Sequence, residues 1–272
     1  MTETKETIAN EKIKDLKTYI SKITNLHNNS GLTQETTFLW FRGQSNQKWK
    51  LEPSIYRSEY WKYLEREAVR DFELFTNKLI HREPANQLEW LFLMQHYGLP
   101  TRLLDWTESH LVALYFSVLD YSDTCDGAVW IIDPWSLNIA TYGQKAIPTS
   151  SNEKLVAEYT LGDPNLVERE VSGTLPVAIR PARNSERIIS QKGTFTIHGK
   201  NTKSLDKIIE EHNSNGKNKI SLKKEIIDGT CKLKILKELY LAGISYSVLF
   251  PEIQGICNDI KIRYSKEFIK CE

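Results

Sequence analysis

The sequence predicts an α+β protein that folds as one globular unit. Some segments repeat apolar residues at helical spacing, others are short runs of β-branched and aromatic residues, and the two kinds do not alternate regularly as in a doubly wound sheet. With 272 residues, 40% of them hydrophobic, the chain can bury a large core. It contains no repeat and no low-complexity linker. We therefore predict an amphipathic helix within residues 1–30 and a single globular unit over residues 31–272.

The N-terminal part predicts a helix followed by a strand. Residues 28–31 close the helix, whose apolar residues are spaced three or four apart: Ile13, Leu16, Ile20 and Ile23. Residues 36–41 are β-branched and aromatic, which predicts a strand. Side chains alternate across a strand, so Arg42 at its end should share a face with Trp40. Gly43 then permits a turn or close packing.

Two helices are expected next. Apolar residues at helical spacing predict a long helix over residues 61–79, which Pro84 breaks. Residues 88–94 have one polar member in seven, which predicts a helix buried nearly all round. Gly98 and Pro100 end it in the usual order, glycine just past the end and proline soon after.

The rest of the chain mixes both element types. Residues 101–106 predict a short strand, and Thr107 is expected to cap a helix that begins at Glu108. Further strands are expected over residues 127–133, 176–180 and 194–198. A polar loop over residues 213–216, a helix over residues 231–242 and an amphipathic stretch after Pro251 complete the order.

Polar residues gather in the most apolar part of the sequence, and the four strongest are Gln95, His96, Arg102 and Asp105. Burying charge is costly unless it is paired. One interpretation is therefore structural, with Arg102 paired to Asp105 and His96 as a satisfied core residue. The other is a ligand cleft, which requires several polar groups converging in an apolar site.

Three arginines in mixed polar and apolar settings indicate an anionic ligand such as a dinucleotide pyrophosphate: Arg42, Arg102 and Arg187. The alternative for Arg42 is a structural ion pair. Gln191 carries a neutral amide that suits a sugar hydroxyl or the amide of nicotinamide, or else caps a sheet edge. Phe195 and Ile197 should point to one face of their strand and the threonines between them to the other.

Composition excludes several classes of protein. The formal charge is +1, although residues 200–237 hold ten lysines against five acids. Phosphate-loop, dinucleotide-fingerprint, serine-hydrolase and zinc-protease motifs are all absent. The four cysteines are scattered, which fits a reducing compartment and no metal site. No signal peptide and no long apolar run occur, so we expect a cytoplasmic protein that does not bind a membrane.

The sequence resembles the FRG domain family, named for its Phe-Arg-Gly. The resemblance runs from about Thr36 to Ile260, and its most specific part is the run over residues 95–106. Other matching segments occur in the same order: residues 40–44, 51–57, 113–116, 127–130, Arg187 with residues 191–195, and 249–251.

The resemblance implies a fold like that of the ADP-ribosyltransferases, in which flanking helices and a split mixed β-sheet surround an NAD cleft. In that fold Arg42 would bind NAD from the first strand, and Thr101 with Arg102 would abut the nicotinamide ribose. The third strand would be residues 191–198, which contain no acid. The nearest candidates for a catalytic carboxylate are Glu186 and Asp105.

The activity that the resemblance implies is NAD-dependent mono-ADP-ribosylation of a macromolecule by a toxin or anti-phage defence effector. The lysines of residues 200–237 favour RNA slightly over protein as the acceptor. A toxin setting leaves open an antitoxin or inhibitory protein as a partner. An NAD glycohydrolase, and a nucleotide- or RNA-binding module without catalysis, are the alternatives. The expected catalytic residues are Arg42, His96, Asp105 and Glu186, and those expected to contact NAD are Arg42, Gly43, Gln95, Thr101, Arg102, Trp106, Arg187, Gln191 and Phe195.

Overall fold

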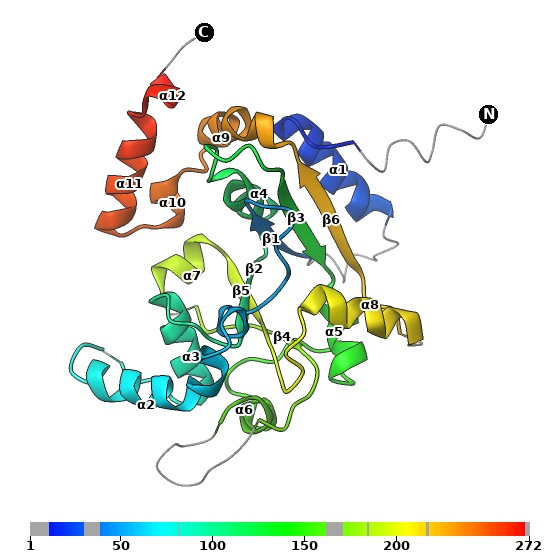
Figure 1. The fold of residues 1–272 in the computed structure, drawn as a ribbon, viewed down its shortest axis with the longest axis vertical. Coiled ribbons are helices and arrows are strands. Elements are labelled where there is room, and N and C mark those ends of the chain that lie inside the picture. The colour runs from blue at the N-terminus through cyan, green and yellow to red at the C-terminus, as the bar shows by residue number, and fades with distance from the viewer. Residues whose placement is uncertain are drawn as a thin grey trace.

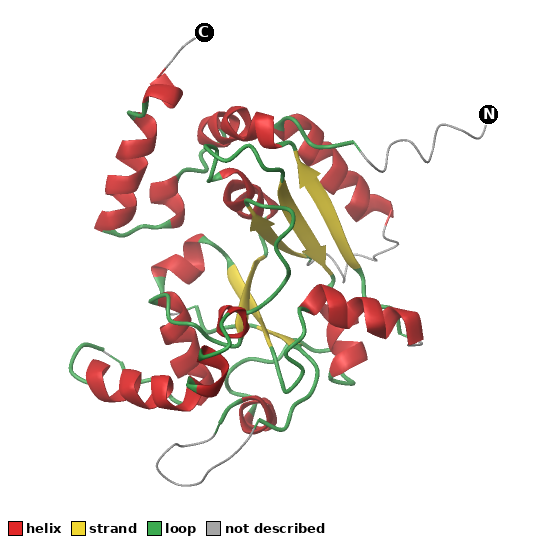
Figure 2. Cartoon of the chain, viewed as in Figure 1, coloured by secondary structure: helices red, strands yellow, loops and turns green. Residues whose placement is uncertain are grey.

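The computed structural model describes residues 11–29, 39–80, 82–161, 171–183, 185–215 and 218–269. Strands lie at the centre of the molecule and helices surround them (Figures 1 and 2). The elements of the first half are α1 Leu16–Asn29, β1 Trp40–Gln44, η3 Ser54–Arg57, η4 Trp61–Tyr63, α2 Glu65–Thr76, α3 Gln87–His96, β2 Leu103–Thr107, α4 His110–Val118, β3 Gly127–Ile132 and α5 Pro134–Thr141. Those of the second half are α6 Glu153–Tyr159, β4 Val177–Ile179, α7 Glu186–Ser190, β5 Gly193–Ile197, α8 Leu205–Asn215, β6 Leu222–Ile227, η5 Gly229–Cys231, α9 Lys232–Leu241, α10 Tyr246–Leu249, α11 Ile253–Arg263 and α12 Lys266–Ile269.

The six strands form one sheet in the order β4-β5-β2-β1-β3-β6. Every pairing between these strands is antiparallel. The α+β class is confirmed, but the expectation of a mixed sheet was wrong. In an antiparallel pair, the chain enters the second strand at the same end of the sheet at which it left the first. A parallel pair would need a connection that crosses to the opposite end of the sheet.

The sheet is almost divided between β1 and β2. Both strands have five register pairs with their outer neighbours, β3 and β5 respectively. With each other they pair only at Phe41, which lies opposite Thr107. Beyond this pair the two strands diverge, so β1-β3-β6 and β2-β5-β4 form two arms of one sheet (Figure 1). The divergence leaves backbone groups between the arms that other parts of the chain must satisfy.

Three apolar clusters hold the helices on the sheet. Helices α1, α4 and α9 cover one face of the β1-β3-β6 arm, and α2, α3 and α6 cover the same side of the β2-β5-β4 arm. On the opposite face α5 and α8 pack across both arms against the buried rings of Trp40, Trp106 and Trp130. In the described part of the chain, no helix is both long and apolar enough to cross a membrane.

Glycine at position 43 allows β1 and α4 to pack closely. A Cβ added at Gly43 would collide with the backbone carbonyl of Ala113 in α4. Gly43 therefore has a packing role on the face of β1 that points away from Arg42. The alternation expected from the sequence is found here, because Arg42 and Trp40 share the other face of β1.

The buried helix predicted at residues 88–94 is confirmed as α3, and Gly98 after it adopts a positive φ of 84°. The long helix predicted over residues 61–79 was wrong. A 3-10 turn and Leu64 precede α2, which ends at Thr76. Three of the six apolar residues that set the helical spacing, Leu64, Phe75 and Leu79, are exposed, whereas Ala68 and Phe72 pack against the core.

Other boundaries also differ from those predicted. Ile13 lies outside the first helix and forms a parallel bridge with Ile227. Residues 30–38, which include the start of the predicted strand, lie outside the described residues, and β1 extends through Arg42 and Gly43 rather than ending before them. Thr107 ends β2 instead of capping a helix, and α4 begins at His110. The residues predicted as a loop at 213–215 end α8, and β6 follows where no strand was predicted.

Candidate functional site

Arg42 bridges the two arms of the sheet where β1 and β2 diverge. Its Nη1 donates a hydrogen bond of 2.6 Å to the backbone carbonyl of Asp105 and lies 3.4 Å from the carboxylate oxygen Oδ2 of the same residue. The side chain thus satisfies a carbonyl that no strand pairing satisfies. Arg42 is 15% exposed and Asp105 is 54% exposed, so the carboxylate remains open to solvent or ligand.

The Asp105 carboxylate is held in a fixed orientation. The amide Nε2 of Gln95 lies 3.0 Å from both of its oxygens. Thr101 in turn donates a hydrogen bond of 2.5 Å from its hydroxyl to Oε1 of Gln95, which fixes the amide so that its NH₂ faces Asp105. Gln95 and Thr101 were predicted to contact a ligand. The structure places them in a series of hydrogen bonds that positions Asp105, and Gln95 also lines a hollow beside that carboxylate.

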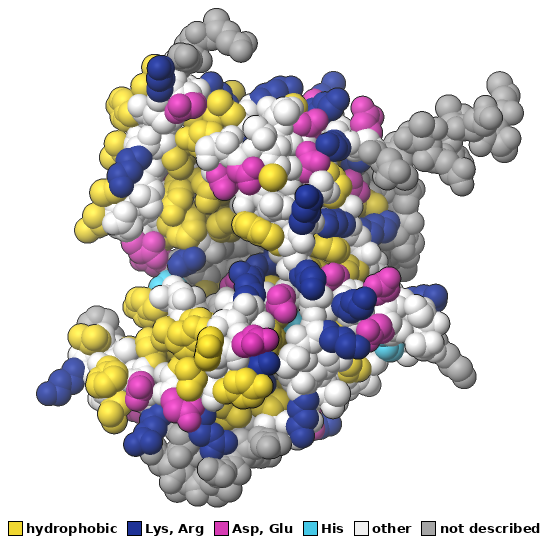
Figure 3. Space-filling model, viewed as in Figure 1, with side chains coloured by type: hydrophobic (Ala, Val, Ile, Leu, Met, Phe, Trp, Pro, Cys, Tyr) yellow, Lys and Arg dark blue, Asp and Glu magenta, His cyan; other side chains and the backbone are white. Residues whose placement is uncertain are grey.

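A cleft of about 750 Å³ opens at the end of β1, beside Arg42. The space-filling view shows a hollow across the middle of the molecule with Lys and Arg side chains in and around it (Figure 3). The loop after β1, η3 and the end of α4 form its walls. The lining residues are Arg42, Gly43, Gln44, Ser45, Lys48, Trp49, Lys50, Glu52, Arg57, Phe116, Leu119 and Asp120.

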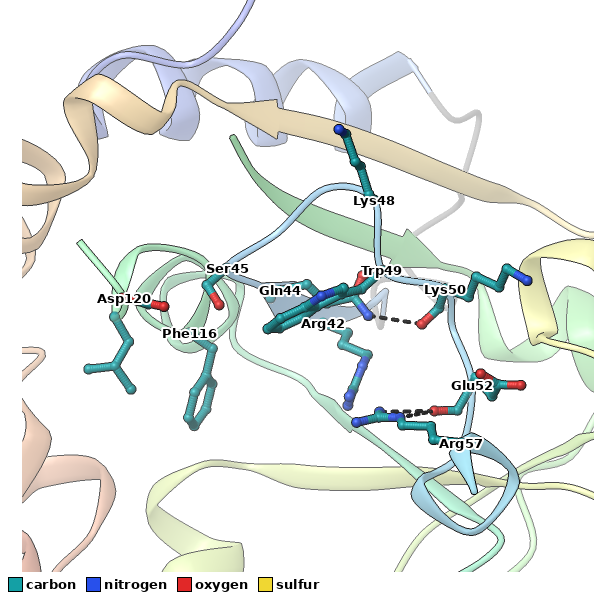
Figure 4. Close-up of a pocket in the computed structure, with 12 residues that line it drawn as sticks. Arg42, Gln44, Ser45, Lys48, Trp49, Lys50, Glu52, Arg57, Phe116 and Asp120 are labelled. Atoms are coloured by element: carbon teal, nitrogen blue, oxygen red, sulfur yellow. Dashed lines mark hydrogen bonds between the residues drawn. The ribbon is translucent and has the colours of Figure 1, made fainter. Parts of the chain in front are cut away.

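Two arginines face each other inside this cleft. The guanidinium groups of Arg42 and Arg57 point toward one another in Figure 4. Arg57 is held there by two hydrogen bonds, of 3.1 and 2.9 Å, to the backbone carbonyl of Glu52. Burial lowers the pKa of Arg42, and the positive charge of Arg57 lowers it further, while Asp105 acts in the opposite direction. Two guanidinium groups facing each other offer paired donors from both sides, so the pair is a strong attractor for an anion.

Arg42 also retains donor capacity. Its Nε is buried and has no hydrogen-bond partner among the described residues. A buried donor without a partner costs free energy comparable to a lost hydrogen bond. An anionic oxygen that entered the cleft would supply the missing acceptor.

The upper wall of the cleft is tied to the core by a buried lysine. Lys232 is fully buried, and its Nζ donates to three backbone carbonyls, those of Ser45 at 2.9 Å, Asp120 at 3.1 Å and Asp123 at 2.9 Å. All three ammonium protons are therefore used. Ser45 and Asp120 line the cleft on different chain segments, so Lys232 joins the two segments.

A second, smaller hollow of about 60 Å³ lies on the other side of Asp105. His96, Arg187, Gln191 and Phe195 line it together with Asp105. Burial lowers the pKa of His96, and the nearby charge of Arg187 lowers it further. Gln95 and Trp106 line it as well, so the structure brings seven of the predicted site residues to one place.

Within this hollow the polar side chains are also tied to the protein. Arg187 donates a hydrogen bond of 3.1 Å to the carbonyl of His96 and stacks 4.7 Å above the ring of Phe250. Gln191 donates one of 3.0 Å to the carbonyl of Leu249. Gln191 follows α7 and precedes β5, so it lines the hollow from the turn before the strand and not from the strand predicted over residues 191–198.

Arg102 does not join Arg42, contrary to prediction. It forms a buried ion pair with Glu65, in which Nε lies 2.7 Å from Oε1 and Nη2 bonds Oε2. The charge and hydrogen bonds of Glu65 raise the pKa of Arg102, although burial alone would lower it. Arg102 and Asp105 are three residues apart, so they occupy opposite faces of their segment. The partner of Arg102 lies 37 residues upstream, which local sequence could not show.

Two further predicted residues have other roles. The indole of Trp106 is buried and donates to the hydroxyl of Thr196 at 3.2 Å, so its main role is in the core. Glu186 is exposed in the first turn of α7, outside the residues that line either hollow. Asp105, rather than Glu186, is therefore the carboxylate that lies beside Arg42.

Sequence reasoning missed most of the cleft wall. Arg57, Trp49, Lys50 and Phe116 line the cleft, yet none was selected as a site residue. The signal that could have identified two of them is the run Lys48-Trp49-Lys50, a large aromatic side chain between two cations in a polar loop.

Behind the cleft, His198 is fully buried beside Arg102, and neither ring nitrogen has a partner among the described residues. Burial, aided by the charge of Arg102, lowers its pKa to about 3. The unfolded chain takes up the proton near pH 6.5, but the folded chain does not. We therefore expect this residue to remove about 2 kcal/mol of stability between pH 7 and pH 5. Urea unfolding at both pH values should show a smaller pH dependence in His198→Phe, and an equal dependence would contradict the assignment.

Residues 37–125 match the family model described as FRG domain, which is about a third of the chain. This match includes Arg42, Arg57 and Asp105. The segments of the resemblance after Cys125 lie beyond it. No curated protein and no solved structure matches the chain.

Proposed function

We propose that the cleft binds the pyrophosphate of NAD and that the protein is a mono-ADP-ribosyltransferase. The observation that carries the proposal is the pair formed by Arg42 and Arg57, which face each other in the cleft (Figure 4). Bringing two like charges together is unfavourable unless an anion neutralises them. Two guanidinium groups offer paired donors to phosphate oxygens, which Lys would offer only as a point charge.

The size and lining of the cleft favour a dinucleotide over a free phosphate. A volume of about 750 Å³ lies within the range of small-molecule sites, and the wall includes the rings of Trp49 and Phe116. Arg42 also links this cleft to Asp105 and the hollow beyond it. A dinucleotide with its phosphates on Arg42 could thus place one end near a carboxylate.

The chemistry proposed for Asp105 is electrostatic. Cleavage of nicotinamide from NAD leaves positive charge on the ribose carbon, and a fixed carboxylate beside that carbon stabilises the charge. Gln95 and Arg42 hold the Asp105 carboxylate without burying it. Preorganisation of this kind removes the cost of reorienting the group during the reaction.

The acceptor proposed is a macromolecule, with RNA slightly favoured over protein. Lys48 and Lys50 lie at the cleft, where they would attract a polyanion, and the lysines of residues 200–237 add to the local positive charge. Action as a toxin or anti-phage effector in the cytoplasm, with an antitoxin or inhibitory partner, follows from the family resemblance and is part of the same proposal.

The direct test uses NAD labelled in its adenylate half, incubated with the protein and whole-cell extract. Nicotinamide release together with label on RNA or protein supports the transferase. Release without label on a macromolecule indicates an NAD glycohydrolase. Binding of NAD without release indicates a nucleotide-binding module, which the engagement of Asp105 by Arg42 and Gln95 would then explain. No binding and no release would overturn the proposal.

A further inference from the structure

The two aromatic side chains that line the cleft, Trp49 and Phe116, differ in how they pack. Trp49 is 55% exposed and belongs to none of the three apolar clusters of the described residues. Burial of a tryptophan side chain contributes strongly to the free energy of folding. An exposed indole makes little of this contribution. In Figure 4 its ring lies beside Gln44, above the guanidinium of Arg42.

The loop that carries Trp49 is fixed at each end and in the middle. Lys232 holds the carbonyl of Ser45 at its start, and Gln44 donates a hydrogen bond of 3.1 Å to the carbonyl of Lys50 at its end. Between them the backbone N–H of Trp49 donates to the carbonyl of Asn46 at 3.2 Å, and Gln47 N–H to the carbonyl of Asp126 at 2.7 Å.

A fixed loop with an exposed ring is preorganised for a ligand. The backbone that carries the ring does not have to be ordered when a ligand arrives, so less conformational entropy is lost on binding. The adjacent charges narrow the class of ligand. Arg42 and Arg57 attract phosphate, and an aromatic face beside a phosphate site suits a nucleobase, whose flat ring stacks on indole.

We propose that Trp49 stacks on the nucleobase of a purine nucleotide whose phosphates are bound by Arg42 and Arg57. This assignment rests on the phosphate site of the proposed function. It extends that proposal by setting the orientation in which the ligand lies in the cleft. The adenine half of NAD would lie along Trp49, and the nicotinamide half would extend past Arg42 toward Asp105.

The test compares two ligands that share phosphates and differ in the base, ADP and inorganic pyrophosphate, by calorimetric titration of the full chain. Trp49→Ala should weaken ADP binding by about 10-fold and change pyrophosphate binding by less than about 2-fold, since one stacking contact is lost. Trp49→Phe should fall between the alanine variant and the unmodified protein. Retained pyrophosphate binding also shows that each variant is folded.

Trp61→Ala is the matched control, because Trp61 is a half-buried tryptophan of η4 that does not line the cleft. It should leave both affinities unchanged. If Trp49→Ala weakens the binding of ADP and of pyrophosphate equally, or weakens the binding of neither ligand, the stacking proposal is overturned while the phosphate site stands. If the unmodified protein binds neither ligand, the phosphate site fails and the assignment of Trp49 fails with it.

Discussion

Arg42→Ala is expected to lower nicotinamide release from NAD by at least about 100-fold while the protein stays folded. The guanidinium is proposed to bind the pyrophosphate, and loss of one preorganised charged donor commonly costs this factor. The fold should persist because the Asp105 side chain beside the carbonyl that loses its donor is 54% exposed, so water that reaches this place can replace the bond. Steady-state release of nicotinamide and a thermal melt measure the two quantities.

Two variants sharpen this experiment. Arg42→Lys keeps the charge but loses the paired donors, and we expect it to recover only a small part of the activity. Arg70→Ala, on the exposed side of α2, removes an arginine outside the cleft and should leave turnover unchanged. Normal turnover in Arg42→Ala would refute the role in NAD binding. An unfolded Arg42→Ala would show instead that the arginine is mainly a clamp between the arms of the sheet.

Glu65→Ala is expected to lower the free energy of unfolding by about 3 to 5 kcal/mol, because it leaves Arg102 buried without a carboxylate. The Arg102 side chain is 8% exposed, and it also donates a hydrogen bond of 3.3 Å to the carbonyl of His198. Glu65 also lies in the first turn of α2, where its charge favours the helix dipole. Urea unfolding monitored by circular dichroism measures the change.

The double variant Glu65→Met with Arg102→Met separates burial from pairing. Two apolar side chains of similar length fill the site and leave no buried charge, so this variant should be more stable than Glu65→Ala. A cost below about 1 kcal/mol for Glu65→Ala would show that water reaches Arg102. Ligand binding at Arg42 should be little affected in either variant, since Arg102 does not line the cleft.

The fold could be predicted where the hydrophobic pattern of a segment matches the burial of that segment in the structure. Helix α3 is apolar on nearly all sides, and the structure buries it between the sheet and α2. Strand β6 was missed because it lies at the edge of the sheet, where Lys223 is exposed and Lys224 is partly exposed. Long-range pairing with β3 stabilises it, and no local pattern reports such pairing.

The site could be predicted only in part, for a related reason. Arg42, Asp105 and Gln95 were identified because polar residues stand out in apolar segments. Arg102 stands out equally, but its partner Glu65 comes from another helix. Arg57 was missed because it lies in a polar segment, where an arginine is unremarkable until the fold brings it opposite Arg42.

Lys232 has a consequence for how the site responds to ionic strength. Its ammonium group fills a cage of three carbonyls much as a bound monovalent cation would. Because this cation is covalently attached, its effective concentration is fixed and its occupancy does not depend on the salt in solution. Dissolved ions, by contrast, screen the attraction between an anionic ligand and the solvent-facing charges of the cleft. Salt should therefore weaken what the cleft binds without altering the shape of the wall that binds it.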